Sequence, residues 1–177
     1  MDIKSDLGYK SQLTIIGFGN TLREDDGIGA YVVKLLKQEF EKNNYIKVKS
    51  LSEYESVYTY NQYQIILKTL HQIDISEAEN LSESDYIFFI DVQHGKYEED
   101  VYIEQILPKR IELGFTTHTF SLSNLLYIIQ TLYKKNPIIY LFAIKGSSFG
   151  FDDKISHLGV FRSKKAVKKI LEFLTYF

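Results

Sequence analysis

The 177-residue chain has no cysteine, and this absence limits the chemistry open to it. Without cysteine there is no disulfide framework, no thiolate metal site and no cysteine nucleophile, so any metal must be held by oxygen and imidazole ligands. Proline is scarce as well, with only two residues, while 45% of the chain is hydrophobic. This composition is typical of a folded domain and not of a disordered chain.

The chain also lacks a surplus of charge and any long uninterrupted hydrophobic run. Its formal net charge is −2, which argues against a general nucleic-acid binder, and no segment has the length of a membrane span. Residues 1–12 are polar and have no apolar core like that of a signal peptide. We therefore expect a single cytoplasmic, monomeric domain over residues 1–177, with 1–12 as an N-terminal extension and no nucleic-acid or membrane partner.

The most informative stretch is Leu13 to Gly29, which reads LTIIGFGNTLREDDGIG. Its first residues form the short apolar run of a strand buried on both faces, and helical spacing of apolar residues begins at Gly29. Gly17 and Gly19 indicate a turn with unusual backbone angles or a close approach of two segments. Three consecutive acids, residues 24–26, therefore lie between the end of a strand and the start of a helix, where open α/β sheets place their sites.

Three interpretations of these acids compete. They could simply cap the helix, although three adjacent acids leave at least one unexplained. A dinucleotide-binding turn is disfavoured, because its third glycine would fall at Leu22 and carboxylates would repel a pyrophosphate. The third interpretation is a carboxylate site for a metal or for general acid–base catalysis, which needs partners from later strand ends.

Asp91 and His118 are candidate partners. Asp91 ends the apolar strand Tyr86 to Ile90; alone it is equally typical of a turn, but it is expected at the same sheet edge as Asp26. His118 precedes an amphipathic helix predicted from Leu122 to Tyr133.

Two further histidines are weaker candidates. His94 is a rival ligand three residues after Asp91, in a loop-like context that favours a supporting or an exposed position. His71 follows a strand predicted from Gln64 to Leu70, and a structural role at the strand end is the preferred interpretation.

The order of predicted elements indicates a three-layer α/β/α fold. We expect a mostly parallel twisted sheet of about five strands, with one antiparallel edge strand at Val101 to Ile106. Residues 45–63 are interpreted as an insertion, with a loop from Glu53 to Gln62 because this tyrosine-rich stretch has no clear period. A last core strand is predicted from Pro137 to Ile144 and a closing helix from Ser163 to Phe177.

Residues 17–29, GFGNTLREDDGIG, resemble the amino-terminal motif of the hydrogenase maturation proteases, G-x-G-N-x-L-x-x-D-(D/E)-x-x-G. A Thr117-His118 pair before a helix is similar to a second element of that family, and the order of elements extends the resemblance over most of the chain. These proteases remove the carboxy-terminal extension from the large subunit of nickel–iron hydrogenases. The resemblance implies a phosphorylase/hydrolase-like fold and a metal-dependent or aspartyl-type endopeptidase whose partner is the large-subunit precursor.

The resemblance also implies roles for particular residues. Asp26, Asp91 and His118 would be the catalytic residues and the metal ligands, with the nickel supplied by the substrate. Further residues would support these ligands or contact the substrate; they are Asn20, Asp25, His71 and His94.

The implied ligand set is chemically consistent with a divalent metal. Two carboxylates and one imidazole suit nickel, zinc, manganese or iron, and three protein ligands leave open positions. We expect the metal mainly to position the peptide and polarise its carbonyl group; Asp25 and Asp26 are the candidates if a carboxylate acts as general base.

Two departures from the family's pattern affect substrate choice more than chemistry: the tyrosine-rich insertion within residues 45–63, and the loop Lys145 to Gly150, which lacks a proline that the family has near this place. Asp26 stands where some relatives have glutamate, which has a longer side chain but the same charge and ligand type. Two alternative functions therefore stay open. One is a peptidase of the same fold that acts on another protein, and the other is a non-catalytic module that binds metal or hydrogenase.

Overall fold

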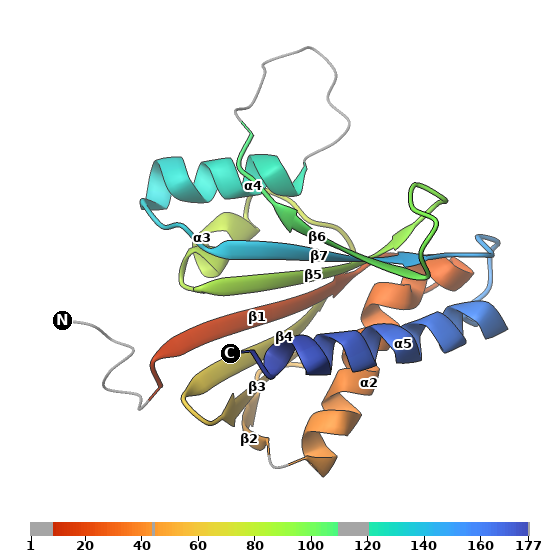
Figure 1. Ribbon diagram of the computed structural model, residues 1–177, viewed down its shortest axis with the longest axis horizontal. Helices are drawn as coiled ribbons and strands as arrows, with labels where there is room; N and C mark the ends of the chain where they lie inside the picture. Colours follow the sequence, from red (N-terminus) through yellow and green to blue (C-terminus); the bar gives the residue numbers. More distant parts are fainter. Residues whose placement is uncertain (1–8, 44, 110–120, 177) are drawn as a thin grey trace.

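The computed structural model describes residues 9–43, 45–109 and 121–176, and it shows a single mixed sheet between two layers of helices (Figure 1). The strands in chain order are β1 (Ser11–Phe18), β2 (Ile46–Ser50), β3 (Glu55–Tyr60), β4 (Tyr63–Leu70), β5 (Tyr86–Gln93), β6 (Val101–Ile106) and β7 (Ile138–Lys145). The helical elements are η1 (Glu24–Gly27), α2 (Ile28–Lys42), α3 (Glu77–Ser82), α4 (Leu122–Ile128), η2 (Ile129–Tyr133) and α5 (His157–Leu174).

The seven strands lie in the order β2-β3-β4-β1-β5-β7-β6. The central strands β4, β1, β5 and β7 are parallel neighbours, whereas β6 is antiparallel to β7 and β3 is antiparallel to both β2 and β4. Five strands therefore point one way and two the other. The predicted antiparallel edge strand is confirmed as β6, but the predicted sheet of about five strands was too small.

The additional strands come from residues 45–63. The loop predicted from Glu53 to Gln62 is wrong, because β3 occupies most of it and Tyr58 is fully buried. Tyr45 stacks on Phe40 at 3.9 Å and on Tyr60 at 4.2 Å between ring centres. Tyrosine suits both half-buried and exposed faces, so these side chains concealed the alternation that a strand normally shows. Whether residues 45–63 are an insertion stays a prediction.

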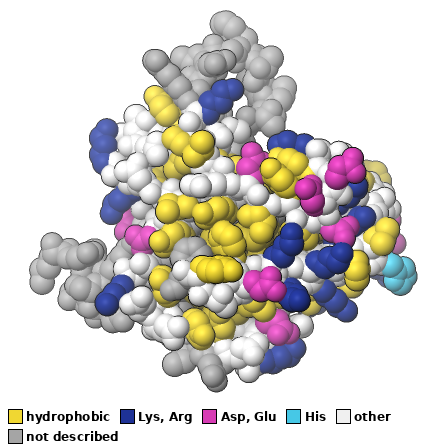
Figure 2. All heavy atoms as spheres, in the orientation of Figure 1, with side chains coloured by type: hydrophobic (Ala, Val, Ile, Leu, Met, Phe, Trp, Pro, Cys, Tyr) yellow, Lys and Arg dark blue, Asp and Glu magenta, His cyan; other side chains and the backbone are white. Residues whose placement is uncertain are grey.

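Both faces of the sheet are covered, which explains the continuous apolar runs of the central strands. Helices α2 and α5 pack on one face, and α3, α4 and η2 pack on the other (Figure 1). Along β1, Leu13 and Ile15 belong to the core under α2 and α5, whereas Ile16 belongs to the opposite core. Figure 2 shows hydrophobic side chains gathered near the middle of the viewed surface, with charged side chains mainly around them.

Helix α5 begins at His157, six residues before its predicted start at Ser163. The Ser156 side chain caps it, with its Oγ accepting a hydrogen bond from Gly159 N at 2.9 Å. This cap is the signal that the helical periodicity alone did not reveal. No helix in the described part of the chain is both long enough and apolar enough to cross a membrane.

Candidate functional site

The carboxyl ends of the parallel strands meet at one edge of the sheet, on the right in Figure 1. Gly17 near the end of β1 is paired with Ile90 of β5, so Asp91 is level with the last residue of β1. The segment that leaves β1 carries the three acids in η1 and continues into α2. The structure thus places Asp26 and Asp91 at the same edge of the sheet.

Two glycines allow α2 to start directly against the strand ends. A Cβ atom on Gly17 would lie 2.0 Å from the Gly29 carbonyl oxygen, and one on Gly29 would lie 2.4 Å from the carbonyl oxygen of Phe18 and 2.6 Å from that of Ile90. No side chain fits into such contacts. The close approach brings η1, and Asp26 with it, onto the end of β5.

Asn20 organises the turn between β1 and η1. Its side-chain Oδ1 accepts a hydrogen bond from Leu22 N at 2.9 Å, and its carbonyl oxygen accepts one from Arg23 N at 3.1 Å. Its own N–H donates to Asp26 Oδ2 at 3.0 Å. The preceding residue, Gly19, has φ +132°, and a Cβ there would lie 1.8 Å from the Asp26 carbonyl oxygen. The glycines and the asparagine of the motif thus fix the position of Asp26.

Asp25 is fully buried and binds residues that follow β7. Its Oδ1 accepts a hydrogen bond from Ser156 N at 2.8 Å, and its Oδ2 accepts from Ser156 Oγ and from Ser147 N, each at 2.8 Å. A Cβ on Gly159 would lie 2.4 Å from its Oδ1, so the carboxylate fits against the first turn of α5. Asp25 therefore joins α5 and the segment after β7 to the site.

Glu24 holds the same segment at a second point. Its Oε2 accepts hydrogen bonds from Ser148 Oγ at 2.5 Å and from Gly150 N at 2.6 Å, and its N–H donates to the Asp152 carbonyl oxygen at 2.8 Å. Neither η1 nor α2 has a side-chain hydrogen bond at its N-cap. The capping interpretation is therefore wrong for α2, since Glu24 and Asp25 bind the loop and helix that follow β7.

Asp26 is the remaining acid of the three. Within the part of the chain that the structure describes, its carboxylate accepts one hydrogen bond, from Asn20 N. Asp26 is half-buried, whereas Asp25 has no exposed surface. Asp26 is thus the acid whose carboxylate the fold leaves available at the sheet edge.

Asp91 is half-buried and faces the negative charge of Asp26. Burial raises the pKa of Asp91 to about 7; the charge of Asp26 also raises this pKa, whereas the hydrogen bond from Val92 N, 2.8 Å from Asp91 Oδ1, lowers it. Among the described residues Asp91 has no ion pair that would offset its burial. Two neighbouring carboxyl groups without a cation are an arrangement that a metal ion or a shared proton stabilises.

The third predicted ligand, His118, lies outside the described residues. Within the described ranges no group of three or more histidine, aspartate or glutamate side chains is arranged to hold a metal ion. His94 is exposed, and its ring stacks on Phe149 at 3.9 Å between ring centres. His71 directly follows β4 and is also exposed. The ligand set Asp26, Asp91 and His118 therefore stays a prediction, with two members placed at one edge.

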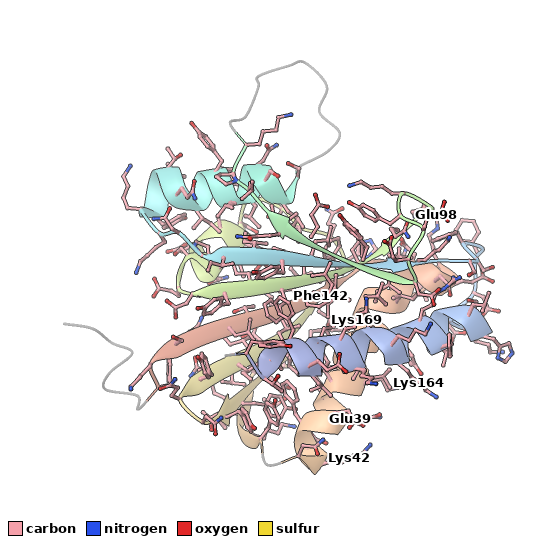
Figure 3. The ribbon with its side chains drawn as sticks, viewed as in Figure 1. Glu39, Lys42, Glu98, Phe142, Lys164 and Lys169 are labelled. Atoms are coloured by element: carbon pink, nitrogen blue, oxygen red, sulfur yellow. The ribbon has the colours of Figure 1, made fainter. Side chains whose placement is uncertain are left out.

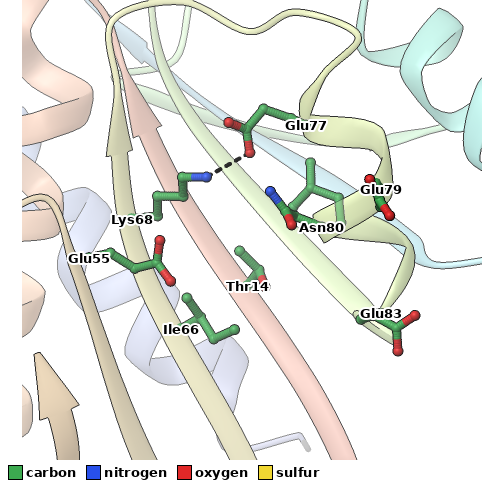
Figure 4. Close-up of a pocket in the computed structure, with 9 residues that line it drawn as sticks. Thr14, Glu55, Ile66, Lys68, Glu77, Glu79, Asn80 and Glu83 are labelled. Carbon is green, nitrogen blue, oxygen red and sulfur yellow. Dashed lines mark hydrogen bonds and ion pairs between the residues drawn. The ribbon is translucent and has the colours of Figure 1, made fainter. Parts of the chain in front are cut away.

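Two cavities lined by described residues lie away from this edge. A groove of about 560 Å³ lies on the surface between α2 and α5, with Glu39, Lys42 and Lys164 among its lining residues (Figure 3). A cavity of about 450 Å³ lies beside α3 and is crossed by the ion pair of Lys68 and Glu77 at 2.7 Å (Figure 4). Neither of these two cavities is lined by Asp26 or Asp91.

Comparison with solved structures identifies the fold. The NiFe hydrogenase maturation protease HycI from Thermococcus kodakarensis KOD1 is 21% identical, with a TM-score of 0.63 over 98% of this chain and 98% of its own. The hydrogenase maturating endopeptidase HybD from E. coli is 15% identical, with a TM-score of 0.64 over 93% of each chain. The hydrogenase 2 maturation peptidase from Thaumarchaeota archaeon SCGC_AB-539-E09 is 19% identical, with a TM-score of 0.59 over 93% of this chain and 98% of its own.

No protein-family model and no curated protein matches the sequence. The match to maturation proteases is therefore one of structure, over nearly the full length and at low identity. It confirms the resemblance predicted from the glycine–acid motif at the level of the fold.

Proposed function

We propose that this protein is a cytoplasmic endopeptidase that removes the carboxy-terminal extension of a nickel–iron hydrogenase large subunit after nickel insertion. The observation that carries the proposal is the pair of Asp26 and Asp91 at the edge where the motif predicts them, without a compensating cation among the described residues. The structural likeness to maturation proteases over more than 90% of the chain supports the same reading.

In this proposal the nickel belongs to the substrate and is recognised by Asp26, Asp91 and His118. The donor set fits, because a buried carboxyl group with a raised pKa beside a second acid gains most from an approaching divalent cation. Recognition of substrate-bound nickel would also delay cutting until the metal has been inserted. A carbonyl group held near the metal is polarised toward attack by water.

Asp26 is our candidate for a general base, should one act on the attacking water. Asp25 is fully buried, and its carboxylate is occupied by backbone N–H groups and a hydroxyl group. A base has to reach the proton that it takes up, and Asp26 is the acid of η1 that can do so from the sheet edge.

The test is incubation with purified precursor subunit, nickel-loaded and nickel-free, followed by intact-mass measurement of the precursor. We expect loss of the carboxy-terminal extension from the nickel-loaded precursor and no change in the nickel-free one. Equal cutting of both would show a peptidase that does not recognise nickel. Nickel-dependent binding without any cutting would instead favour a non-catalytic binding module.

A further inference from the structure

Two large apolar residues stand exposed beside the candidate site. Leu22 is 67% exposed and Phe151 is 91% exposed. They lie on adjoining segments, because the guanidinium carbon of Arg23 is 5.4 Å from the centre of the Phe151 ring and the neighbouring Glu24 N–H binds the Asp152 carbonyl group. Exposed apolar side chains that gather at one place typically mark a contact surface.

Both side chains project from backbone that is held in place. Leu22 lies within the turn organised by Asn20, which also binds Asp26 through its N–H. Phe151 stands between two residues, Gly150 and Asp152, that are each hydrogen-bonded to Glu24. Among the described residues neither side chain is buried, although several hydrogen bonds hold the segments that carry them. Apolar anchors on rigid backbone lose little conformational entropy when a partner binds.

A small apolar pocket adjoins these residues. It has a volume of about 190 Å³, and its lining includes Gly27, Ala30, Tyr31 and Ile155, with Lys34 and Asp153 among its polar residues. Thr21, the neighbour of Leu22, lines it as well. Gly27 directly follows Asp26 in η1, so the pocket begins one residue from the candidate site.

We propose that Leu22, Phe151 and this pocket form a docking surface for the folded body of the substrate protein, which contacts them through an apolar surface of its own. This inference rests on the proposed function. A protein substrate whose scissile peptide lies at Asp26 and Asp91 has to extend over the adjoining surface, and the pocket and the two exposed residues adjoin the same turn. A few clustered residues supply most of the binding energy in many protein interfaces.

The test compares Leu22→Ser, Phe151→Ser and the double variant with the wild type. The control is Leu132→Ser, because Leu132 is 65% exposed and lies in η2, which packs on the other face of the sheet. The readout is the KM and the kcat for cutting of the nickel-loaded precursor, measured by intact mass. Urea unfolding of each variant verifies that it is folded, and substitutions of exposed side chains are expected to leave it so.

We expect the double variant to raise KM about tenfold or more with kcat unchanged within about twofold, because docking is lost and the chemistry is not. Leu132→Ser should match the wild type. An unchanged KM in the folded double variant, or an equal rise in Leu132→Ser, would overturn the docking surface and leave the proposed function standing. A wild-type protein that does not cut the nickel-loaded precursor at all would overturn both.

Discussion

At the scale of single residues, three neighbouring acids divide two tasks between them. Glu24 and Asp25 hold the segment after β7, and Asp26 stays at the sheet edge opposite Asp91. The sequence did not show this division, because all three side chains are carboxylates and nothing in the sequence indicates which of them binds a distant loop and which faces a site. Asp25 differs from Asp26 in being fully buried, and its burial depends on the positions that Ser147 and Ser156 take in the fold.

The raised pKa of Asp91 predicts a free energy of unfolding that falls as pH rises. Its folded-state pKa of about 7 lies above the unfolded value near 3.9, so between these pH values the folded protein binds more protons than the unfolded chain. The free energy of unfolding should therefore decline from about pH 4 to pH 7 by at most about 4 kcal/mol from this group, and then level off.

Asp91→Asn should remove that decline and stabilise the protein at pH 8, since a neutral amide avoids the cost of the buried charge. Urea unfolding at several pH values measures the effect, with the exposed Glu98→Gln as control. An Asp91→Asn variant that is less stable than the wild type at pH 8 would contradict the assigned environment.

Asp25→Ala should be strongly destabilising. It would leave the N–H groups of Ser147 and Ser156 and the Ser156 hydroxyl without their acceptor in a buried place, at a cost of about 3–5 kcal/mol in the free energy of unfolding. This is more than the 0.5–2 kcal/mol of an ordinary helix cap. Denaturant unfolding measures this loss in the free energy of unfolding, with the exposed Glu83→Ala as control. A loss below about 1 kcal/mol in Asp25→Ala would show that the contacts of Asp25 are weak.

At the scale of elements, the site depends on how closely α2 approaches the strand ends. A Cβ on Gly29 would lie 2.4 Å from the Phe18 carbonyl oxygen, so Gly29→Ala has to push α2 and η1 away from the sheet. We expect a loss of about 3 kcal/mol and a lower kcat for precursor cutting. Gly95→Ala is the control, because nothing lies within 4 Å of its added Cβ and only its φ of +83° costs about 1 kcal/mol. Equal losses in both variants would contradict the close-packing explanation.

The elements themselves were predictable where one periodicity dominated. The apolar runs that begin at Leu13 and at Tyr86 predicted two central strands, and the apolar stripe in residues 122–133 predicted α4 and η2. β3 was missed because its tyrosines concealed the alternation of a strand, although it pairs with its sequence neighbours β2 and β4. The start of α5 was missed because its cap at Ser156 is completed by Asp25, 131 residues earlier. The contact between Asp25 and Ser156 has no local signal in the sequence.

At the scale of the whole molecule, residues from separate segments have to meet to bind a metal. Asp91, with a pKa of about 7, and a histidine, whose ordinary pKa is about 6.5, both have to lose a proton, so nickel affinity should rise from pH 6 to pH 8 with release of protons. Calorimetry at several pH values measures this. His118→Ala and Asp91→Asn should each weaken binding and flatten its pH dependence; wild-type dependence in His118→Ala would remove that residue from the ligand set.

The central claim is that precursor cutting depends on the carboxylate pair of Asp26 and Asp91. The most direct measurement is the intact mass of a nickel-loaded precursor after incubation with wild type or with Asp91→Asn, whose fold is verified by urea unfolding. We predict that the wild type removes the carboxy-terminal extension and that Asp91→Asn leaves the precursor intact while being the more stable protein at pH 8. Cutting by Asp91→Asn at the wild-type rate would contradict the account.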